Sequence, residues 1–261
     1  MTVLLVLVGV LGLVVGSFLN VVIHRVPRRE SVLRPGSHCT RCLAAIKPWH
    51  NVPVLSWLLL RGRCDHCEQR ISPRYPLVEA GTSLLFVAAA ARFGLTLALP
   101  AYLYLAAIAV ALAMIDVEAR RLPDAIVLPS YLVGALLLIA AGAAHADWSS
   151  AGRGLLAMAA LWTFYVTIAI LHPGGMGLGD VKLGGLLGLY LGWLGWSAVW
   201  IGTLAGFLVG GLVAAALLAT GRANRKTAIP FGPAMLAGAM LAVFVASPVA
   251  TWYRGLLSPT A

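Results

Sequence analysis

Charged residues are scarce in this chain of 261 residues, where Asp, Glu, Lys and Arg together make up 11% and hydrophobic residues 61%. A soluble globular domain carries about 25% charged residues, so this composition excludes one. Among the charged residues the acidic ones are the scarcer, with 9 Asp and Glu against 19 Lys and Arg. We also find no low-complexity tract, internal repeat or lipidation signal. Long apolar runs make up most of the sequence instead.

Each of these apolar runs is a candidate membrane span, because a helix that crosses a bilayer needs about 20 mostly apolar residues. We predict an all-α polytopic membrane protein of about eight spans, at 2–22, 77–93, 98–115, 126–144, 154–171, 183–194, 197–220 and 232–249. The sixth span is short and rich in glycine, so we expect either a tilted helix or one that runs almost directly into the seventh. Small residues predicted to permit close helix packing are Gly188, Gly192, Gly206 and Gly210.

The basic residues are unevenly placed, which explains the net charge of +10 without nucleic acid as a partner. Segments 24–76, 117–124, 172–182 and 221–231 hold 16 of the 19 Lys and Arg residues. The positive-inside rule places these segments in the cytoplasm and both termini on the opposite side of the membrane, which is the periplasm for a protein of the bacterial inner membrane. No basic residue precedes the first span, so we predict a retained helix and not a cleaved signal peptide.

All four cysteines lie in the only long polar segment, 24–76. They form two Cys-x-x-Cys pairs separated by 21 residues, namely Cys39 with Cys42 and Cys64 with Cys67. This spacing is typical of a zinc ribbon, in which four thiolates hold a structural Zn²⁺ and metal binding supplies much of the folding free energy. The alternative is two disulfides or unlinked thiols, which the predicted cytoplasmic location disfavours. We predict His38 and His66 to be neighbours of the metal and not ligands.

Two aspartates stand at the ends of predicted spans, where ionisable residues indicate function. Asp116 ends the third span and Asp180 precedes the sixth, so the two intervening spans return the chain to the same membrane face. Paired carboxylates hydrolyse peptides when one acts as general base toward water and the other as general acid. Gly177 and Gly179 beside Asp180 are predicted to let a substrate backbone approach, or to adopt positive φ.

Purely structural interpretations of these residues remain open at this stage. Asp116 could pair with Arg120 at the i,i+4 spacing, and Asp180 could be a helix N-cap. Asp124 is predicted to be the N-cap of the fourth span. A non-catalytic zinc-bearing scaffold, or a transporter in which the aspartates bind ions or protons, is an alternative of another class.

Further motifs follow one another along the chain: GSFLNVVIHR at 16–25, PWHNVPVLSW at 48–57, GRC at 62–64, ISPRYPLVE at 71–79, GMGLGDVKL at 175–183 and IPFGP at 229–233. With the segment around Asp116, they resemble the type IV prepilin peptidases nearly from end to end. The sequence departs from the family pattern at His24 and Thr40, which are neither presumed cysteine ligands nor catalytic aspartates.

The resemblance implies a bifunctional enzyme. Such an enzyme cuts the basic leader from type IV prepilins and type II secretion pseudopilins after a glycine at the cytoplasmic face. It then methylates the new N-terminal amine with S-adenosylmethionine. By the resemblance, Asp116 and Asp180 are the catalytic pair and the four cysteines bind zinc. A peptidase that has lost methyl transfer is the second enzymatic alternative, which the intact cysteine set disfavours.

The resemblance also implies three parts: a first transmembrane helix at 1–23, a zinc-binding loop at 24–76 and a membrane-embedded aspartic peptidase at 77–261. Residues 16–25 and 74–79 are expected to help methyl transfer or leader binding. No Gly-x-Gly-x-x-Gly fingerprint follows a strand, so the sequence does not locate the methyl-donor site. It does not indicate the oligomeric state either.

Overall fold

The computed structural model describes residues 1–39, 41–172, 175–222, 224, 227 and 229–257. Thr40 and parts of the segments 172–182, 221–231 and 77–261, which entered the sequence predictions, lie outside these residues. The helices are α1 (Thr2–Arg25), α2 (Leu55–Leu59), α3 (Arg74–Phe93), α4 (Leu99–Ala119), α5 (Asp124–His145), α6 (Trp148–Leu171), α7 (Leu178–Leu194), α8 (Trp196–Ala219) and α9 (Gly232–Leu257), with short 3-10 helices η1 (Val26–Arg28) and η2 (Pro48–Asn51). Within the described residues the chain forms no strand, so the predicted all-helical class is confirmed.

Among the residues that the structure describes, seven helices are long and apolar enough to cross a membrane, namely α1, α3, α4, α5, α6, α8 and α9. The predicted span at 183–194 forms the greater part of α7, which has 17 residues and a length of about 25 Å at 1.5 Å per residue. This is short of the hydrocarbon thickness of about 30 Å. Only Gly195, with φ +137°, separates α7 from α8, so the sixth span does run almost directly into the seventh.

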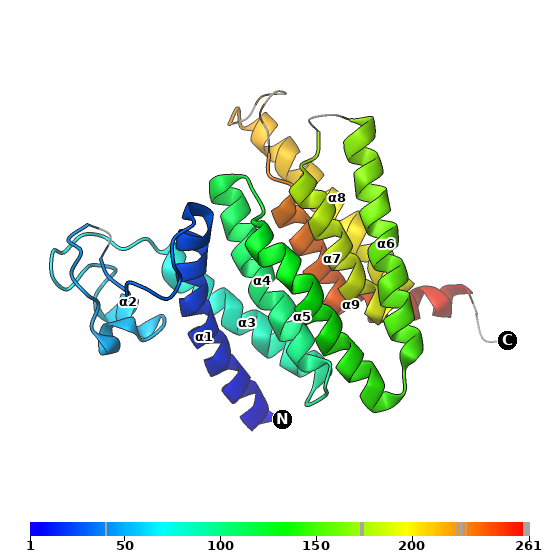
Figure 1. Cartoon of the computed structure of the whole chain (residues 1–261), viewed down its shortest axis with the longest axis horizontal. Helices are drawn as coiled ribbons and strands as arrows, with labels where there is room; N and C mark the ends of the chain where they lie inside the picture. Colours follow the sequence, from blue (N-terminus) through cyan, green and yellow to red (C-terminus); the bar gives the residue numbers. More distant parts are fainter. Residues whose placement is uncertain (40, 173–174, 223, 225–226, 228, 258–261) are drawn as a thin grey trace. The chain divides into compact units, whose positions relative to one another are not determined.

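The chain divides into two compact units, Met1–Ile115 and Asp116–Ala261. In the first unit α1 and α3 lie side by side, and the loop that carries α2 connects them (Figure 1). Glycines let the two helices touch: a Cβ added at Gly12 would lie 2.6 Å from Ser83 Cα, and one at Gly16 would lie 2.7 Å from Glu79 Cα. The Ser83 hydroxyl donates a hydrogen bond of 2.8 Å to the Gly9 carbonyl, which links the pair across the contact.

In the second unit α7 is the central helix, packed on α5, α6, α8 and α9 (Figure 1). Every residue from Leu183 to Gly192 is buried, as expected for a helix that is apolar on all sides. A Cβ at Gly188 would lie 2.4 Å from the Ala157 carbonyl oxygen of α6, and one at Gly192 would lie 2.8 Å from the Arg153 carbonyl oxygen. Glycine is therefore what allows α6 and α7 to approach, which confirms the prediction for these positions.

The contact between α8 and α9 follows the same rule. A Cβ at Gly206 would lie 3.3 Å from Met235 Cα, and one at Gly210 would lie 3.0 Å from the Phe231 ring. The closest approach involves a residue that the sequence did not single out: a Cβ at Gly238 would lie 2.4 Å from the Gly206 nitrogen. Small residues on both helices bring the two backbones together.

The α6–α7 contact predicts a matched pair of stability effects. Gly188→Ala should lower the free energy of unfolding by about 1–3 kcal/mol, because the added methyl overpacks the interface. Gly211→Ala makes the same change in α8 where a Cβ would meet nothing within 4 Å, so it should leave stability unchanged or slightly raised. Thermal unfolding of both variants in detergent compares them. Equal midpoints for the two variants would contradict the packing role of Gly188.

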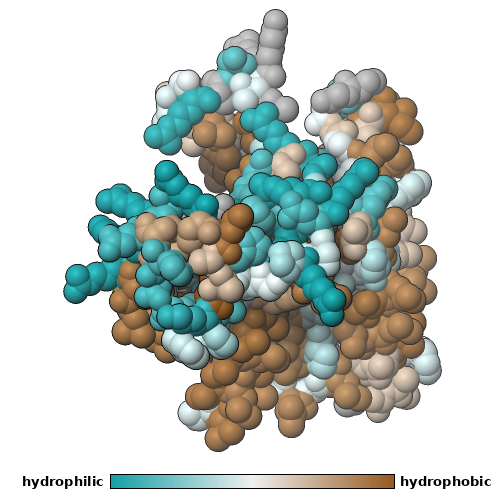
Figure 2. Space-filling view, turned by 60° about the vertical axis from the view of Figure 1, so that its left-hand side comes forward, coloured by the Kyte–Doolittle hydropathy of each residue, from teal (hydrophilic) through white to brown (hydrophobic). Residues whose placement is uncertain are grey.

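The surface agrees with a bilayer environment. Figure 2 shows hydrophobic side chains over the flanks of the helices and hydrophilic ones gathered over the loop that carries the cysteines. On α8, for example, Trp200, Leu208 and Leu212 are each about two-thirds exposed. Apolar side chains exposed in such number on long helices are suited to lipid and not to water.

Asp147 is the N-cap of α6. Its carboxylate accepts hydrogen bonds from the Ser150 hydroxyl at 2.6 Å, the Ser149 hydroxyl at 2.7 Å and the Ser150 N–H at 3.1 Å. These bonds, led by those from Ser150, lower the pKa of Asp147 to about 2. The carboxylate is thus engaged in holding the first turn of the helix.

Candidate active site and metal centre

Asp116 lies in the last turn of α4 and is 5% exposed. The backbone N–H of Gly232, the first residue of α9, donates a hydrogen bond to its carboxylate. A Cβ at Gly232 would lie 2.6 Å from Asp116 Oδ2, so only glycine fits against the carboxylate here. The start of a helix favours negative charge, which suits an anionic side chain at this position.

Asp180 lies in the first turn of α7 and is half-buried. The helix begins after Gly177, and the Gly177 N–H donates a hydrogen bond of 3.2 Å to Asp180 Oδ2. Asp180 is therefore the third residue of the helix and not its N-cap, which corrects that alternative. An acidic side chain that reaches back to the N-cap N–H is half of a capping box.

The two carboxylates lie within electrostatic range of each other, since the charge of Asp116 acts on Asp180. Both belong to the second compact unit. The end of α4 and the starts of α7 and α9 meet here, while the prediction that both aspartates lie at one membrane face stays a prediction. The structure therefore brings together the two aspartates that the sequence singled out, each held by a backbone N–H at a helix start.

Asp124 was predicted to be the N-cap of α5, and this is wrong. The N-cap is Pro123, and Asp124 is the first helical residue. Its two carboxylate oxygens accept hydrogen bonds of 2.8 and 2.9 Å from Lys182 Nζ of α7. The ion pair thus ties the start of α5 to the start of α7 next to Asp180.

Packing favours glycine at one of the two positions beside Asp180, and the predicted positive φ is wrong. Gly177 has φ −77°, and Gly179 lies inside the first turn of α7. A Cβ at Gly179 would lie 3.1 Å from Leu122 Cβ, and one at Gly177 would lie 3.4 Å from Asp180 Oδ2. Packing therefore favours glycine at 179, whereas a side chain at 177 would make an ordinary contact, and access for a substrate backbone stays a prediction.

The four cysteines converge in the first unit although 21 residues separate the pairs. Their sulfur atoms all lie within 4.8 Å of one another. Cys39 Sγ and Cys67 Sγ are 3.9 Å apart, close to the ~3.8 Å that tetrahedral coordination with Zn–S bonds of about 2.3 Å requires. All four are free cysteines, so the disulfide alternative is not what the structure has. They are positioned to bind a metal ion.

The two Cys-x-x-Cys turns are built alike. In the first, the Cys39 N–H donates to the Ala44 carbonyl and the Leu43 N–H to the Cys39 carbonyl, both at 2.9 Å. In the second, the same bonds join Cys64 with Gln69 and Glu68 with Cys64, again at 2.9 Å. Leu43 and Glu68, each directly after the second cysteine of its pair, have φ of 60° and 55°. The equivalent turns present equivalent sulfur atoms.

Backbone donors favour the thiolate form in this cluster. The N–H groups of Cys42 and Arg41 point at Cys39 and lower the pKa of its thiol to about 6. The His66 N–H likewise lies 3.5 Å from Cys64 Sγ. A thiolate is the form that binds metal, so the backbone of the first turn favours the binding form of Cys39. At Cys67 the Gln69 N–H acts in the same direction, but burial and the neighbouring thiols raise the pKa to about 11.

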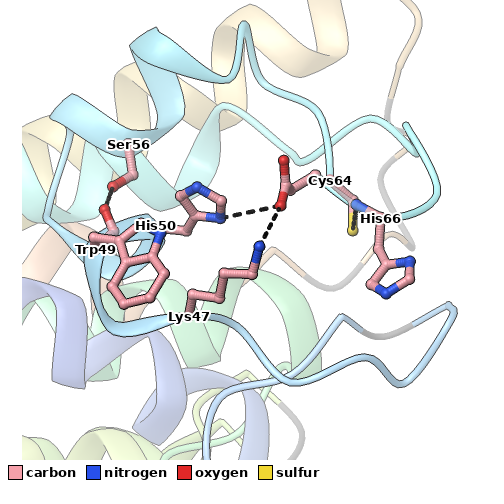
Figure 3. A network of polar contacts seen from close by, with 7 residues as sticks. Lys47, Trp49, His50, Ser56, Cys64 and His66 are labelled. Atoms are coloured by element: carbon pink, nitrogen blue, oxygen red, sulfur yellow. Dashed lines mark hydrogen bonds and ion pairs between the residues drawn. The ribbon is translucent and has the colours of Figure 1, made fainter.

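Polar contacts brace the loop around the cysteines. Figure 3 shows Lys47 and His50 converging on one carboxylate oxygen, Oδ2 of Asp65, at 3.3 and 3.5 Å. The same view shows the Ser56 hydroxyl donating to the Trp49 carbonyl, at 3.0 Å. His66 makes its contact with Cys64 through its backbone, which agrees with its prediction as a neighbour.

Gly232 is the site residue that sequence reasoning missed. It appeared only within IPFGP, as one of the motifs that carried the resemblance. A signal was present, because a glycine followed by Pro233 is a suitable start for a helix. The need for glycine arises from Asp116, which lies more than a hundred residues earlier and meets Gly232 only in the fold.

Helices long enough to cross a bilayer, paired aspartates at the ends of two helices and a four-cysteine cluster define a multi-pass membrane protein with an acid-pair site. Family comparisons agree with this class. The bacterial peptidase A24 N-terminal domain matches residues 10–93, and the type IV leader peptidase family matches residues 103–253. The chain belongs to the type IV leader peptidase family, and it is a multi-pass inner-membrane protein.

Several curated relatives are named prepilin leader peptidase/N-methyltransferase. That of Pseudomonas putida is 38% identical, over 91% of this chain and 89% of its own. That of Aeromonas salmonicida strain A449 is 35% identical, over 95% and 92%, and that of Myxococcus xanthus is 41% identical, over 84% and 64%. No solved structure matches the chain.

Proposed function

We propose that this protein cuts the basic leader from type IV prepilins and type II secretion pseudopilins after a glycine, and then N-methylates the new N-terminal residue. The observation that carries the proposal is the pairing of Asp116 with Asp180 within the segment that matches the leader peptidase family. Relatives whose names state both activities support it. The chain is accordingly a protease and a methyltransferase.

In the proposed mechanism the two carboxylates share the work of peptide hydrolysis. One removes a proton from water as it attacks the scissile carbonyl, and the other protonates the carbonyl oxygen and later the leaving amine. For this the pair must hold one proton between them, which their proximity favours because two neighbouring carboxylates do not both ionise easily. The N–H groups of Gly232 and Gly177 keep the carboxylates oriented.

The four cysteines would hold Zn²⁺ in a closed structural site, because all four coordination positions are then taken by thiolates. The metal would supply folding free energy to a loop with little apolar core.

Methyl transfer requires S-adenosylmethionine, which supplies a methyl group that moves from its positively charged sulfur to the amine, leaving S-adenosylhomocysteine. The secondary ammonium that forms releases one proton to water and becomes the secondary amine.

We further propose the arrangement in the membrane and along the chain. The uneven distribution of basic residues supports a cytoplasmic position for the cysteine loop and both aspartates, with periplasmic termini. A substrate whose apolar helix lies in the bilayer would then present its basic leader on the same side. Residues 1–23 would form the first membrane helix, 24–76 the zinc-binding loop and 77–261 the peptidase.

The test is an in vitro reaction of the purified protein with a prepilin and S-adenosylmethionine in liposomes, followed by mass spectrometry. We expect loss of the leader and the addition of one methyl group. Cleavage without methylation would favour the peptidase-only alternative. An intact substrate would contradict the proposal and favour an ion- or proton-binding role for the aspartates.

A further inference from the structure

The first compact unit contains a cavity of about 520 Å³ that the peptidase chemistry does not use. The C-terminal half of α1, the start of α3 and the cysteine loop line it, including Cys39 and Cys64. Its size is within the range of about 300–1,000 Å³ that is usual for small-molecule sites. All of its lining residues lie between Ser17 and Glu79.

Glu79 places a buried carboxylate at this cavity. The residue is 8% exposed, and its Oε2 accepts a hydrogen bond of 2.7 Å from the Val54 N–H. The Ser17 hydroxyl also donates to this carboxylate. A carboxylate has about four acceptor positions, so two neutral donors leave capacity for a further partner. A cationic ligand would compensate the buried negative charge, which is otherwise costly.

Asn20 adds an independent polar group on the same wall. It is 4% exposed and lines the cavity, and its amide nitrogen donates a hydrogen bond of 3.1 Å to the Tyr75 carbonyl. In the part of the chain that the structure describes, no group donates a hydrogen bond to its Oδ1. A buried amide oxygen of this kind is costly unless a donor completes it.

The remaining lining carries both signs of charge and aromatic faces. Four Lys and Arg residues stand beside three Asp and Glu residues, and Trp57 and Tyr75 contribute rings. A small ligand with an aromatic ring, cationic groups and a carboxylate matches this mixed lining.

We propose that this cavity binds S-adenosylmethionine, with Glu79 facing its cationic methionine end and Asn20 Oδ1 accepting a hydrogen bond from one of its donors. The inference rests on the proposed methyl transfer and assigns residues to it. The motif residues at 16–25 and 74–79, whose role the sequence left open between methyl transfer and leader binding, then contribute to the walls of the methyl-donor site.

The experiment measures S-adenosylmethionine binding to the full-length protein by isothermal titration calorimetry, without any prepilin. We expect Glu79→Gln and Asn20→Ala each to weaken binding by at least about tenfold, since each removes a buried polar partner. Glu68→Gln is the matched control, because Glu68 belongs to the same unit, is exposed and does not line the cavity. Its affinity should equal that of the wild type.

Amide hydrogen exchange of the wild type, compared with and without S-adenosylmethionine, needs no variant, so it tests the proposal even if a variant fails to fold. S-adenosylmethionine should slow exchange at 17–24 and 52–57. Unchanged affinity in folded Glu79→Gln and Asn20→Ala, or protection only elsewhere, overturns the assignment while methyl transfer stands. Protection of these segments by a basic leader peptide, but not by S-adenosylmethionine, overturns it in favour of a leader site. A wild type that neither binds the donor nor methylates overturns both the assignment and the proposed transferase.

Discussion

Replacing either aspartate of the pair, as in Asp116→Asn or Asp180→Asn, is expected to lower the rate of leader cleavage by about 10²–10⁴-fold. Asparagine has nearly the same shape but no titratable group, so it cannot serve as general base or acid. Its amide oxygen can still accept the N–H of Gly232 or of Gly177, so the fold should be retained. Mass spectrometry of the prepilin product over time measures the effect.

Asp147→Asn is the matched control for these variants. It makes the same chemical change in the same compact unit, at a residue that caps α6. Asparagine caps helices about as well as aspartate, so cleavage should stay at the wild-type rate. A wild-type rate in either Asp116→Asn or Asp180→Asn would remove that residue from the mechanism. Equal losses in all three variants would indicate a general structural effect.

Two single substitutions, Cys39→Ser in the first pair and Cys64→Ser in the second, should each abolish metal binding. The wild type is expected to hold one Zn²⁺ per chain and each variant none, because a structural site needs all four thiolates. Without the metal the loop should open, since its folding depends on coordination. Elemental mass spectrometry reports the metal, and trypsin cleavage within 24–76 reports the opening.

His66→Ala is the control for the metal site. The contact of His66 with Cys64 is made by the backbone N–H, which alanine retains. Metal content and resistance to trypsin should therefore stay at the wild-type level. Loss of zinc in this variant would show that a histidine belongs to the ligand set. Disulfides in protein purified under native redox conditions would contradict the metal site altogether.

The sequence by itself determined the helical class, because the bilayer requires long apolar runs that satisfy their own backbone hydrogen bonds. It also identified Asp116, Asp180 and the paired cysteines, since ionisable residues at span ends and Cys-x-x-Cys spacing carry chemical meaning along the chain. From the number of spans between the two aspartates it predicted that they lie at one face, and the structure brings them within electrostatic range of each other. The residues at which helices begin were predicted less well. Asp180 and Asp124 were both considered as N-caps, but each lies in the first turn of its helix, because polar residues occur there too.

Only the tertiary structure decided which groups meet. Residue 232 must be glycine because the Asp116 carboxylate lies against it. Lys182 pairs with Asp124 because α5 and α7 begin side by side. The cavity with Glu79 and Asn20 likewise forms where α1, α3 and the cysteine loop come together. The physical reason is that apolar length and ligand spacing belong to single segments, whereas burial, packing and hydrogen-bond partners depend on segments that are distant along the chain.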